Sequence, residues 1–293
     1  MARSNINLVD DLSLADYMII GRGKGKTASY RIGPQMDEED VLSNKSYKRP
    51  YDGDLINTPY WKWRPKRCIG DDVESLGYLV GYMQHISRWE FLRRLENPTA
   101  EFFVDEFFEV KFFQGKYRRN RLIEKKEILP DKNGIYHMDF PYKSFEGKPM
   151  NHLMIDIKNL DEAHTFYAAM PALVNDFSIF TETLTGGSVE FQPEFQKSSR
   201  EGKSLPFQLE DYISEFNYEY VPLYFKLIVS ASDFEVSSFA QKGLDKPKVD
   251  RTVGRGFSDF AVEVSHVNKS DWATQTFEIR FKNPFYSKPP EEV

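Results

Sequence analysis

The stretch that comes closest to a catalytic motif is IIGRGKGKTASYRIGP, residues 19–34. A phosphate-binding P-loop reads G-x-x-x-x-G-K-[ST], because backbone N–H groups surround the β-phosphate while the Lys and the Ser or Thr reach the γ-phosphate and Mg²⁺. Residues 25–27 (Gly-Lys-Thr) match the end of this motif. The first glycine, however, should fall at Ile20, and Gly21 comes one residue too late. A P-loop also opens onto a helix, which Gly33-Pro34 would end early.

The other interpretation of this stretch is a basic arm that lies against a partner or a polyanion. Residues 1–70 hold 12 Lys or Arg and 9 Asp or Glu, whereas the whole chain has a formal net charge of −6. The beginning of the chain is therefore mildly basic and the remainder acidic. This asymmetry is typical of an arm that contacts an acidic neighbour or a nucleic acid, although solvated charge explains it equally well. Its contact candidates in the Gly/Lys stretch are Arg22, Lys24 and Lys26.

Aromatic and cationic residues alternate in YWKWRPKR, residues 60–67. Such a pattern suits either a stacking platform for single-stranded nucleic acid or an anchor in a subunit interface, where Trp, Tyr and Arg are enriched. We favour the interface. The contact candidates here are Tyr60, Trp61, Trp63 and Arg64.

Other chemistry has little support in the sequence. The one cysteine, Cys68, excludes an internal disulfide and a cysteine-rich zinc site, and the five histidines do not form a ligand pair of the H-x-x-x-H type. No G-x-S-x-G nucleophile motif occurs. We therefore expect a protein that is not an enzyme and has no cofactor. Because the sequence has neither a signal peptide nor eighteen consecutive apolar residues, we expect no membrane span and a reduced, cytoplasmic environment.

The elements that would position these residues begin with a helix. Between residues 72 and 96, apolar side chains recur every three or four positions, which predicts an amphipathic helix that Asn97-Pro98 ends. Three Phe pairs follow at a spacing of five residues. This spacing fits neither the helical nor the strand period, so the segment could form either a helix or a strand. They lead to a basic cluster at a turn, which is either a solvated loop tip or a contact with acidic groups or phosphates. Its candidates are Lys116, Arg118, Arg119 and Arg121.

The second half of the chain reads largely as strands. A hairpin is predicted from residues 121–129 and 135–140 around Asn133-Gly134, because Asn-Gly suits the positive-φ positions of a tight turn. Alternating apolar residues predict further strands at 152–157, 188–195, 218–232, 260–267 and 274–282. A second helix is predicted over residues 161–180, interrupted by Pro171 and closed by Gly186-Gly187. A charged loop at 241–256 is too long for a simple turn and supplies the contact candidates Lys246, Lys248 and Arg251.

The predicted fold is therefore α+β: a mainly antiparallel β sandwich or barrel with two helices and an extended N-terminal arm. The arm covers residues 1–70. The body covers residues 71–293, as one domain with a long loop at 241–256. Clean alternation in the last strands favours antiparallel pairing with one covered face.

The strand, helix and strands that run from His152 to Phe281 resemble the β-sandwich-plus-helix layout of tail-tube and tail-completion proteins of tailed bacteriophages. The resemblance covers roughly the second half of the chain and includes no diagnostic motif; basic N-terminal arms also occur in capsid proteins. It implies a structural virion subunit in a tail, neck or capsid, assembled in the host cytoplasm from copies of itself and other subunits through the arm and the loop. Single-stranded nucleic-acid binding is the first alternative, and a P-loop NTPase with an atypical loop is the second.

Overall fold

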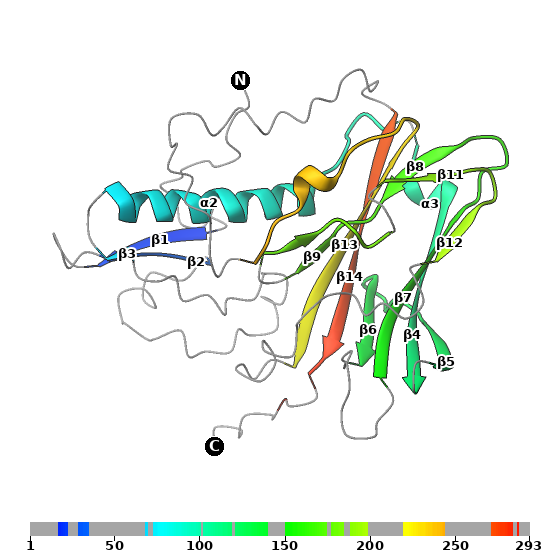
Figure 1. The fold of residues 1–293 in the computed structure, drawn as a ribbon, viewed down its shortest axis with the longest axis horizontal. Helices are drawn as coiled ribbons and strands as arrows, with labels where there is room; N and C mark the ends of the chain where they lie inside the picture. The colour runs from blue at the N-terminus through cyan, green and yellow to red at the C-terminus, as the bar shows by residue number, and fades with distance from the viewer. Residues whose placement is uncertain are drawn as a thin grey trace.

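A computed structural model describes residues 17–22, 29–34, 68–69, 73–100, 102–118, 121–139, 150–174, 177–184, 188–198, 219–243, 271–283 and 286. Among these residues, a four-stranded sheet and a seven-stranded sheet face each other, and a long helix, α2 (Val73–Arg94), lies on the outer face of the larger sheet (Figure 1). Both sheets are open, and nearly all pairings are antiparallel. The α+β prediction with antiparallel sheets is confirmed in this coarse form, without a closed barrel.

The four-stranded sheet has the order β12-β7-β4-β5. Its strands are β4 (Phe108–Arg118), β5 (Arg121–Ile128), β7 (Met150–Asn159) and β12 (Gln196–Ser198). A four-residue helix, α3 (Val104–Phe107), leads directly into β4, so the Phe pairs form both a helix and a strand. The strand predicted at 152–157 is present as β7.

The seven-stranded sheet has the order β10-β9-β13-β14-β6, with β8 also paired to β13 and β11 paired to β8. Its strands are β6 (Ile135–Asp139), β8 (Phe166–Ala169), β9 (Ala172–Val174), β10 (Ile179–Phe180), β11 (Val189–Phe191), β13 (Tyr220–Ser230) and β14 (Trp272–Lys282). The strands predicted at 218–232 and 274–282 are therefore present as β13 and β14. A short 3-10 helix, η4 (Ser237–Phe239), follows β13.

Strand β13 is the centre of the fold, because it is buried on both faces. Leu223 and Phe225 point into the core between the two sheets, whereas Tyr224 and Ile228 pack against α2. The helix contributes Trp89 to this second core, where its ring makes edge contacts with Phe177 and Tyr224. A strand covered on both sides needs apolar residues at nearly every position, which accounts for the continuous run YVPLYFKLIVS.

The C-terminal end of α2 is held by polar groups of the sheet. Lys226 on β13 is 1% exposed, and its Nζ donates to Thr276 Oγ1 at 2.9 Å and to the Arg93 carbonyl at 3.4 Å. The Thr274 hydroxyl on β14 donates to the Leu95 carbonyl at 2.7 Å. The last carbonyls of a helix have no partner within the helix, and a cation there also interacts favourably with the helix dipole. These contacts therefore dock and cap the helix together.

The helix that we predict over residues 161–180 is wrong, because the described part of this segment forms β8, β9 and β10. Residues 166–174 run along β13, and the Pro171 carbonyl accepts the N–H of Lys226 at 3.0 Å. An amphipathic helix needs one polar face, but this segment is buried almost throughout. Pro171, which lacks an N–H, separates the two strands. The layout on which the bacteriophage resemblance rests thus loses its helix. Its strands at 152–157, 218–232 and 274–282 are present, and the strand predicted at 260–267 lies outside the described residues.

The two strands predicted at 121–129 and 135–140 are present as β5 and β6, and their turn is present too, but their pairing as a hairpin is wrong. Gly134 has φ +77°, and Asp131 Oδ1 accepts the N–H groups of Asn133 and Ile135. The strands on either side, however, enter different sheets: β5 pairs with β4, and β6 pairs with β14 in parallel. β5 is strongly charged and occupies a sheet edge, whereas β6 buries Met138 in the core between the sheets. The turn therefore joins the two layers.

Within the predicted arm, the described residues form a small antiparallel sheet of β1 (Tyr17–Arg22), β2 (Ser29–Pro34) and β3 (Cys68–Ile69). β2 and β3 contact α2. No pattern in the sequence predicts this three-stranded sheet. β2 begins two residues after Thr27, so the chain that follows the P-loop-like residues is a strand and not the helix that a P-loop requires.

Candidate functional site

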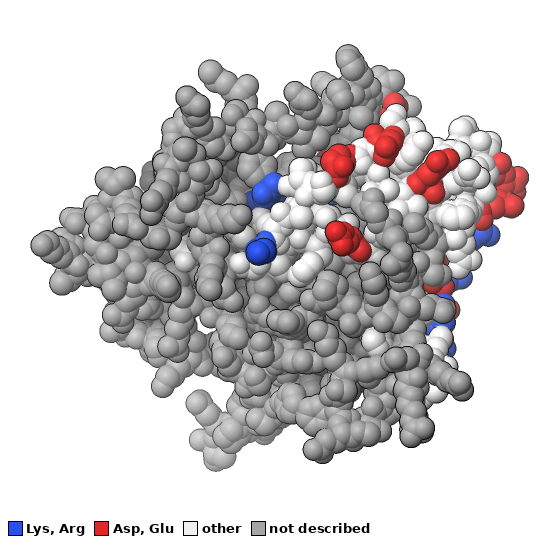
Figure 2. Space-filling model, viewed as in Figure 1, with Lys and Arg blue, Asp and Glu red and all other residues white. Residues whose placement is uncertain are grey.

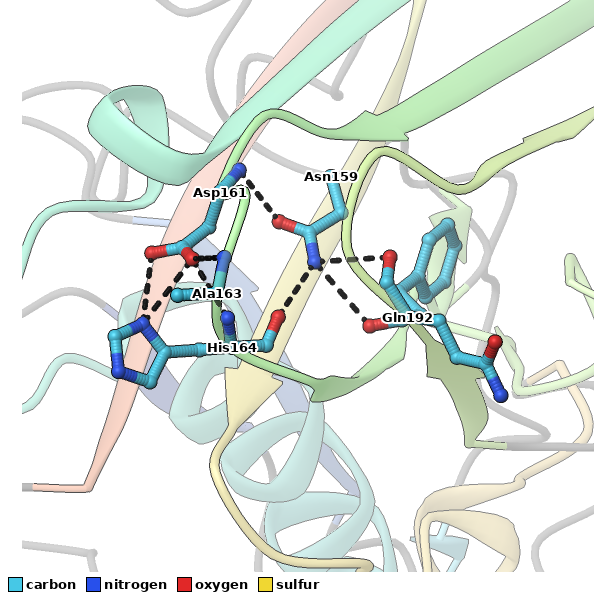
Figure 3. A network of polar contacts seen from close by, with 6 residues as sticks. Asn159, Asp161, Ala163, His164 and Gln192 are labelled. Atoms are coloured by element: carbon cyan, nitrogen blue, oxygen red, sulfur yellow. Dashed lines mark hydrogen bonds and ion pairs between the residues drawn. The ribbon is translucent and has the colours of Figure 1, made fainter.

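The best-defined polar arrangement lies where β4 begins and β7 ends. The Asn159 side chain is fully buried, and its Nδ2 donates toward the carbonyls of His164 (3.0 Å), Phe191 (3.2 Å) and Gln192 (3.1 Å). Its Oδ1 accepts the N–H of Asp161 at 3.0 Å. Figure 3 shows the amide between the loop after β7 and the chain around β11. One side chain thereby fixes two loops that are about thirty residues apart in the sequence.

The loop after β7 is fixed a second time by Asp161. Its Oδ1 accepts the N–H groups of Ala163 (2.6 Å) and His164 (2.7 Å), and both carboxylate oxygens lie within 3.1 Å of His164 Nδ1 (Figure 3). The hydrogen bond from His164 and the backbone N–H groups lower the pKa of the Asp161 carboxyl. Asp often closes a turn in this way, by binding N–H groups two and three residues ahead.

Backbone hydrogen bonds connect the same loops to α3 and β12. The N–H of Leu160 donates to the Phe107 carbonyl at 2.7 Å, and the N–H of Asn159 donates to the Phe195 carbonyl at 3.0 Å. In the core next to these loops, the Phe108 ring makes edge contacts with Phe166 and Phe191, with ring centroids 5.6 and 5.7 Å apart. Aromatic pairs in this geometry stabilise a core beyond their buried area. The end of the four-stranded sheet is therefore a rigid aromatic platform.

Three large apolar side chains are exposed on this platform. Phe103 is 69% exposed, Leu160 is 42% exposed and Phe195 is 44% exposed. Leu160 and Phe195 lie at the rung where Phe108 of β4 pairs with Asn159 of β7, and Phe103 precedes the four-residue helix α3 that leads into this rung. We call these three residues the apolar end. Scattered exposed apolar residues are ordinary, but several large ones at one place on a rigid frame are typical of an interaction surface.

Acidic residues surround the apolar end. The segments 102–108, 159–166 and 189–196 contain no Lys or Arg, and their carboxylates are Asp105, Glu106, Asp161, Glu162, Glu190 and Glu194. Figure 2 shows carboxylates gathered over the part of the molecule where Figure 1 places β8, β11 and α3. An apolar centre with a charged rim is the usual anatomy of a protein–protein interface. The rim would favour a cationic partner.

The structure brings together only part of the predicted contact set. Lys116, Arg118 and Arg121 lie beside the turn between β4 and β5, as expected, and Arg118 is opposite Arg121. Lys116 binds Glu124 of its own chain at 2.8 Å. This turn is at the opposite end of β4 from the apolar end. Arg22 ends β1. The remaining candidates lie outside the described residues: Lys24, Lys26, Tyr60, Trp61, Trp63, Arg64, Arg119, Lys246, Lys248 and Arg251. The strand predicted at 260–267 and most of the loop at 241–256 also lie outside them.

Sequence reasoning missed the apolar end itself. Phe103 belongs to a Phe pair, but the spacing of these pairs does not indicate which member is buried. The structure answers this: Phe108 and Phe112 enter the core, whereas Phe103 faces outward. The neighbouring sequence also does not indicate that Leu160 is exposed, because its exposure depends on the turn made by Asn159 and Asp161. The run of carboxylates without Lys or Arg is visible in the sequence only after the three segments are known to meet.

Two further observations bear on function. Among the described residues, no three His, Cys, Asp or Glu side chains are grouped so that they could hold a metal ion. Likewise, the described part of the chain contains no helix with the length and apolar character needed to cross a membrane. Comparison of the chain with models of known protein families and with curated proteins finds no match.

Proposed function

We propose that this chain is a structural, non-enzymatic subunit of an oligomeric assembly of the kind found in bacteriophage virions. The observation that carries this proposal is the apolar end, in which Phe103, Leu160 and Phe195 are exposed and the chain at Leu160 and Phe195 is fixed by hydrogen bonds of the buried Asn159. Burial of such side chains by a neighbouring subunit would contribute about 1.5–3 kcal/mol for each one that is fully covered.

The rest of the chain fits a subunit that holds neighbours together. The stretch of residues 1–70 is mildly basic and rich in aromatic residues, whereas the remainder is acidic, so one copy offers groups that complement another. The open, mostly antiparallel sheets agree with the strands of the layout that resembles bacteriophage tail proteins, although the helix of that layout is replaced by β8 and β9. Within a virion, the subunit would belong to the tail, the neck or the capsid and would assemble in the host cytoplasm with copies of itself and other structural subunits.

The oligomeric state of the purified chain tests this proposal. Size-exclusion chromatography with light scattering would be run on the chain alone, with a short single-stranded oligonucleotide, and with ATP and Mg²⁺. We expect a defined oligomer whose mass is the same in all three conditions. A chain that stays monomeric at about 100 μM would contradict the proposal. A monomer that shifts only with the oligonucleotide at low salt would favour nucleic-acid binding, and ATP turnover would favour the P-loop NTPase.

A further inference from the structure

We infer that the apolar end is the receptor for residues 60–67 of a second copy of this chain, so that subunits join head to tail. This inference rests on the proposed function and names the surface and the segment through which the assembly forms. The segment YWKWRPKR contains three aromatic residues, four cations and no acidic residue. The receptor offers three exposed apolar side chains and the carboxylates of three segments that contain no Lys or Arg, with Lys158 one rung away along β7.

The two surfaces match in chemistry. Trp and Tyr side chains provide large apolar area with few rotatable bonds, and they are the common energetic centres of protein interfaces. The ring of Phe103, which is 69% exposed, would pack against such an aromatic side chain. Around it, Lys and Arg of the segment would face Asp105, Glu106 and Glu194 on the rim. Rim charges of this kind set the orientation and the rate of association more than the affinity.

The length of the chain favours docking between copies. Residues 60–67 end next to β3, which contacts α2 and lies beside the N-terminal end of that helix (Figure 1). In Figure 1, α3, which follows Phe103 directly, lies beyond the C-terminal end of α2. A helix of 22 residues is about 33 Å long at 1.5 Å per residue, whereas eight residues reach at most about 28 Å when fully extended. The segment therefore falls short of the apolar end of its own chain.

A contact between two different surfaces has a consequence for the assembly. Each subunit would use the segment toward one neighbour and the apolar end toward the next, which is a heterologous interface. Such contacts close into a ring when the rotation between subunits divides a full turn, and otherwise continue as a helical filament. Both forms occur among structural assemblies, and a two-fold dimer is not expected.

Two full-length variants separate the halves of this interface. Phe103→Asp removes the receptor, and the double variant Trp61→Ala with Trp63→Ala removes the anchor. Each change should weaken self-association by at least about thirtyfold, which is the effect of losing one interface hot spot. Because Phe103 is exposed, Phe103→Asp should unfold in urea like the wild type. Leu129→Asp is the matched control, because Leu129 is 73% exposed but lies at the turn between β5 and β6, and it should assemble normally.

Mixing the two variants provides the decisive result. The anchor of the Phe103→Asp chain can still dock on the intact apolar end of the double variant, and neither chain can extend further. Light scattering should therefore show a one-to-one complex that stops at two subunits. If either variant assembles like the wild type, or if the mixture stays monomeric, the inference is wrong while the proposed function stands.

A labelled synthetic peptide of residues 60–67 distinguishes failure of the inference from failure of the proposed function. Fluorescence anisotropy should show binding to the double variant, about thirtyfold weaker binding to Phe103→Asp, and weaker binding of a scrambled peptide. If the wild-type chain is monomeric but binds the peptide at the apolar end, the proposed function is wrong and the docking site is supported. If the wild-type chain assembles but does not bind the peptide, the docking site is wrong and the proposed function is supported.

Discussion

At the scale of single residues, Asn159 is the group on which the shape of the apolar end depends most. Its amide donates toward three carbonyls, so Asn159→Asp would place a carboxylate against the same three acceptors. We expect a loss of about 3 kcal/mol in the free energy of unfolding at pH 7, because a buried charge would replace a satisfied donor. Urea denaturation measures this loss.

The penalty of Asn159→Asp should become smaller as the pH falls, because a protonated Asp regains a donor. The same change at Asn133, which is exposed in the turn before β6, is the control and should cost no more than about 0.5 kcal/mol. Equal effects of the two substitutions would show that the network around Asn159 contributes little.

The buried Lys226 should make the free energy of unfolding depend on pH, and this dependence can be assigned to its side chain alone. Burial lowers the pKa of Lys226 to about 8; nearby Glu96 opposes this shift and Arg93 adds to it. Between about pH 8 and the ordinary value of 10.5, the folded chain binds fewer protons than the unfolded chain, so stability rises with pH in this window. Below pH 8 the lysine is protonated in both states, and its contribution is constant.

The variant Lys226→Met removes this proton and keeps the length of the side chain. From pH 7 to pH 10.5, the wild type should gain on the order of 3 kcal/mol in unfolding free energy relative to the variant. Urea denaturation at the two pH values measures the difference. Lys242→Met, at an exposed position, should follow the wild type. A wild-type-minus-variant difference that is the same at both pH values would mean that Lys226 is not desolvated in the folded chain.

At the scale of elements, two glycines should respond to the same substitution with opposite signs. Gly81 lies inside α2, and a Cβ there would meet no atom within 4 Å, so Gly81→Ala should stabilise the chain by about 1 kcal/mol. Gly134 has φ +77°, so Gly134→Ala should destabilise the turn between β5 and β6 by about 1 kcal/mol, although space is free there too. Thermal unfolding of both variants checks this; shifts of the same sign would contradict the assigned backbone conformations.

The elements also show which features the sequence could predict. α2 is predictable because its apolar residues recur with the helical period, and the turn at Asn133-Gly134 is predictable because positive φ requires particular residues there. Residues 166–174 are not predictable in this way, since burial on both faces removes the pattern that separates strand from helix. The partner of β6 is β14, about 140 residues away, and local spacing contains no information on such pairing.

The candidate site illustrates the same limit. The sequence contains all of its residues, but they belong to three segments that meet only in the fold. The aromatic and cationic segment at 60–67 can be recognised from its composition, because its residues are consecutive. The surface that we assign to it could not be recognised, because Phe103, Leu160 and Phe195 are apolar residues whose exposure depends on the fold: Phe103 precedes α3, and Leu160 and Phe195 lie in the loops that Asn159 connects.

At the scale of the whole molecule, the central place of β13 affects how the chain can fold during synthesis. β13 pairs with β8 and β9, which precede it, but also with β14, which ends at Lys282. β6 pairs with β14, so a strand near the middle of the chain cannot pair until a strand near its C-terminus has been synthesised. Pairings so distant in sequence slow folding, because the loops between them must close first. The seven-stranded sheet can therefore be completed only after β14 has left the ribosome, and until then one edge of the apolar strand β13 has no partner. A nascent chain in this state exposes the kind of surface that chaperones bind and that aggregates most readily.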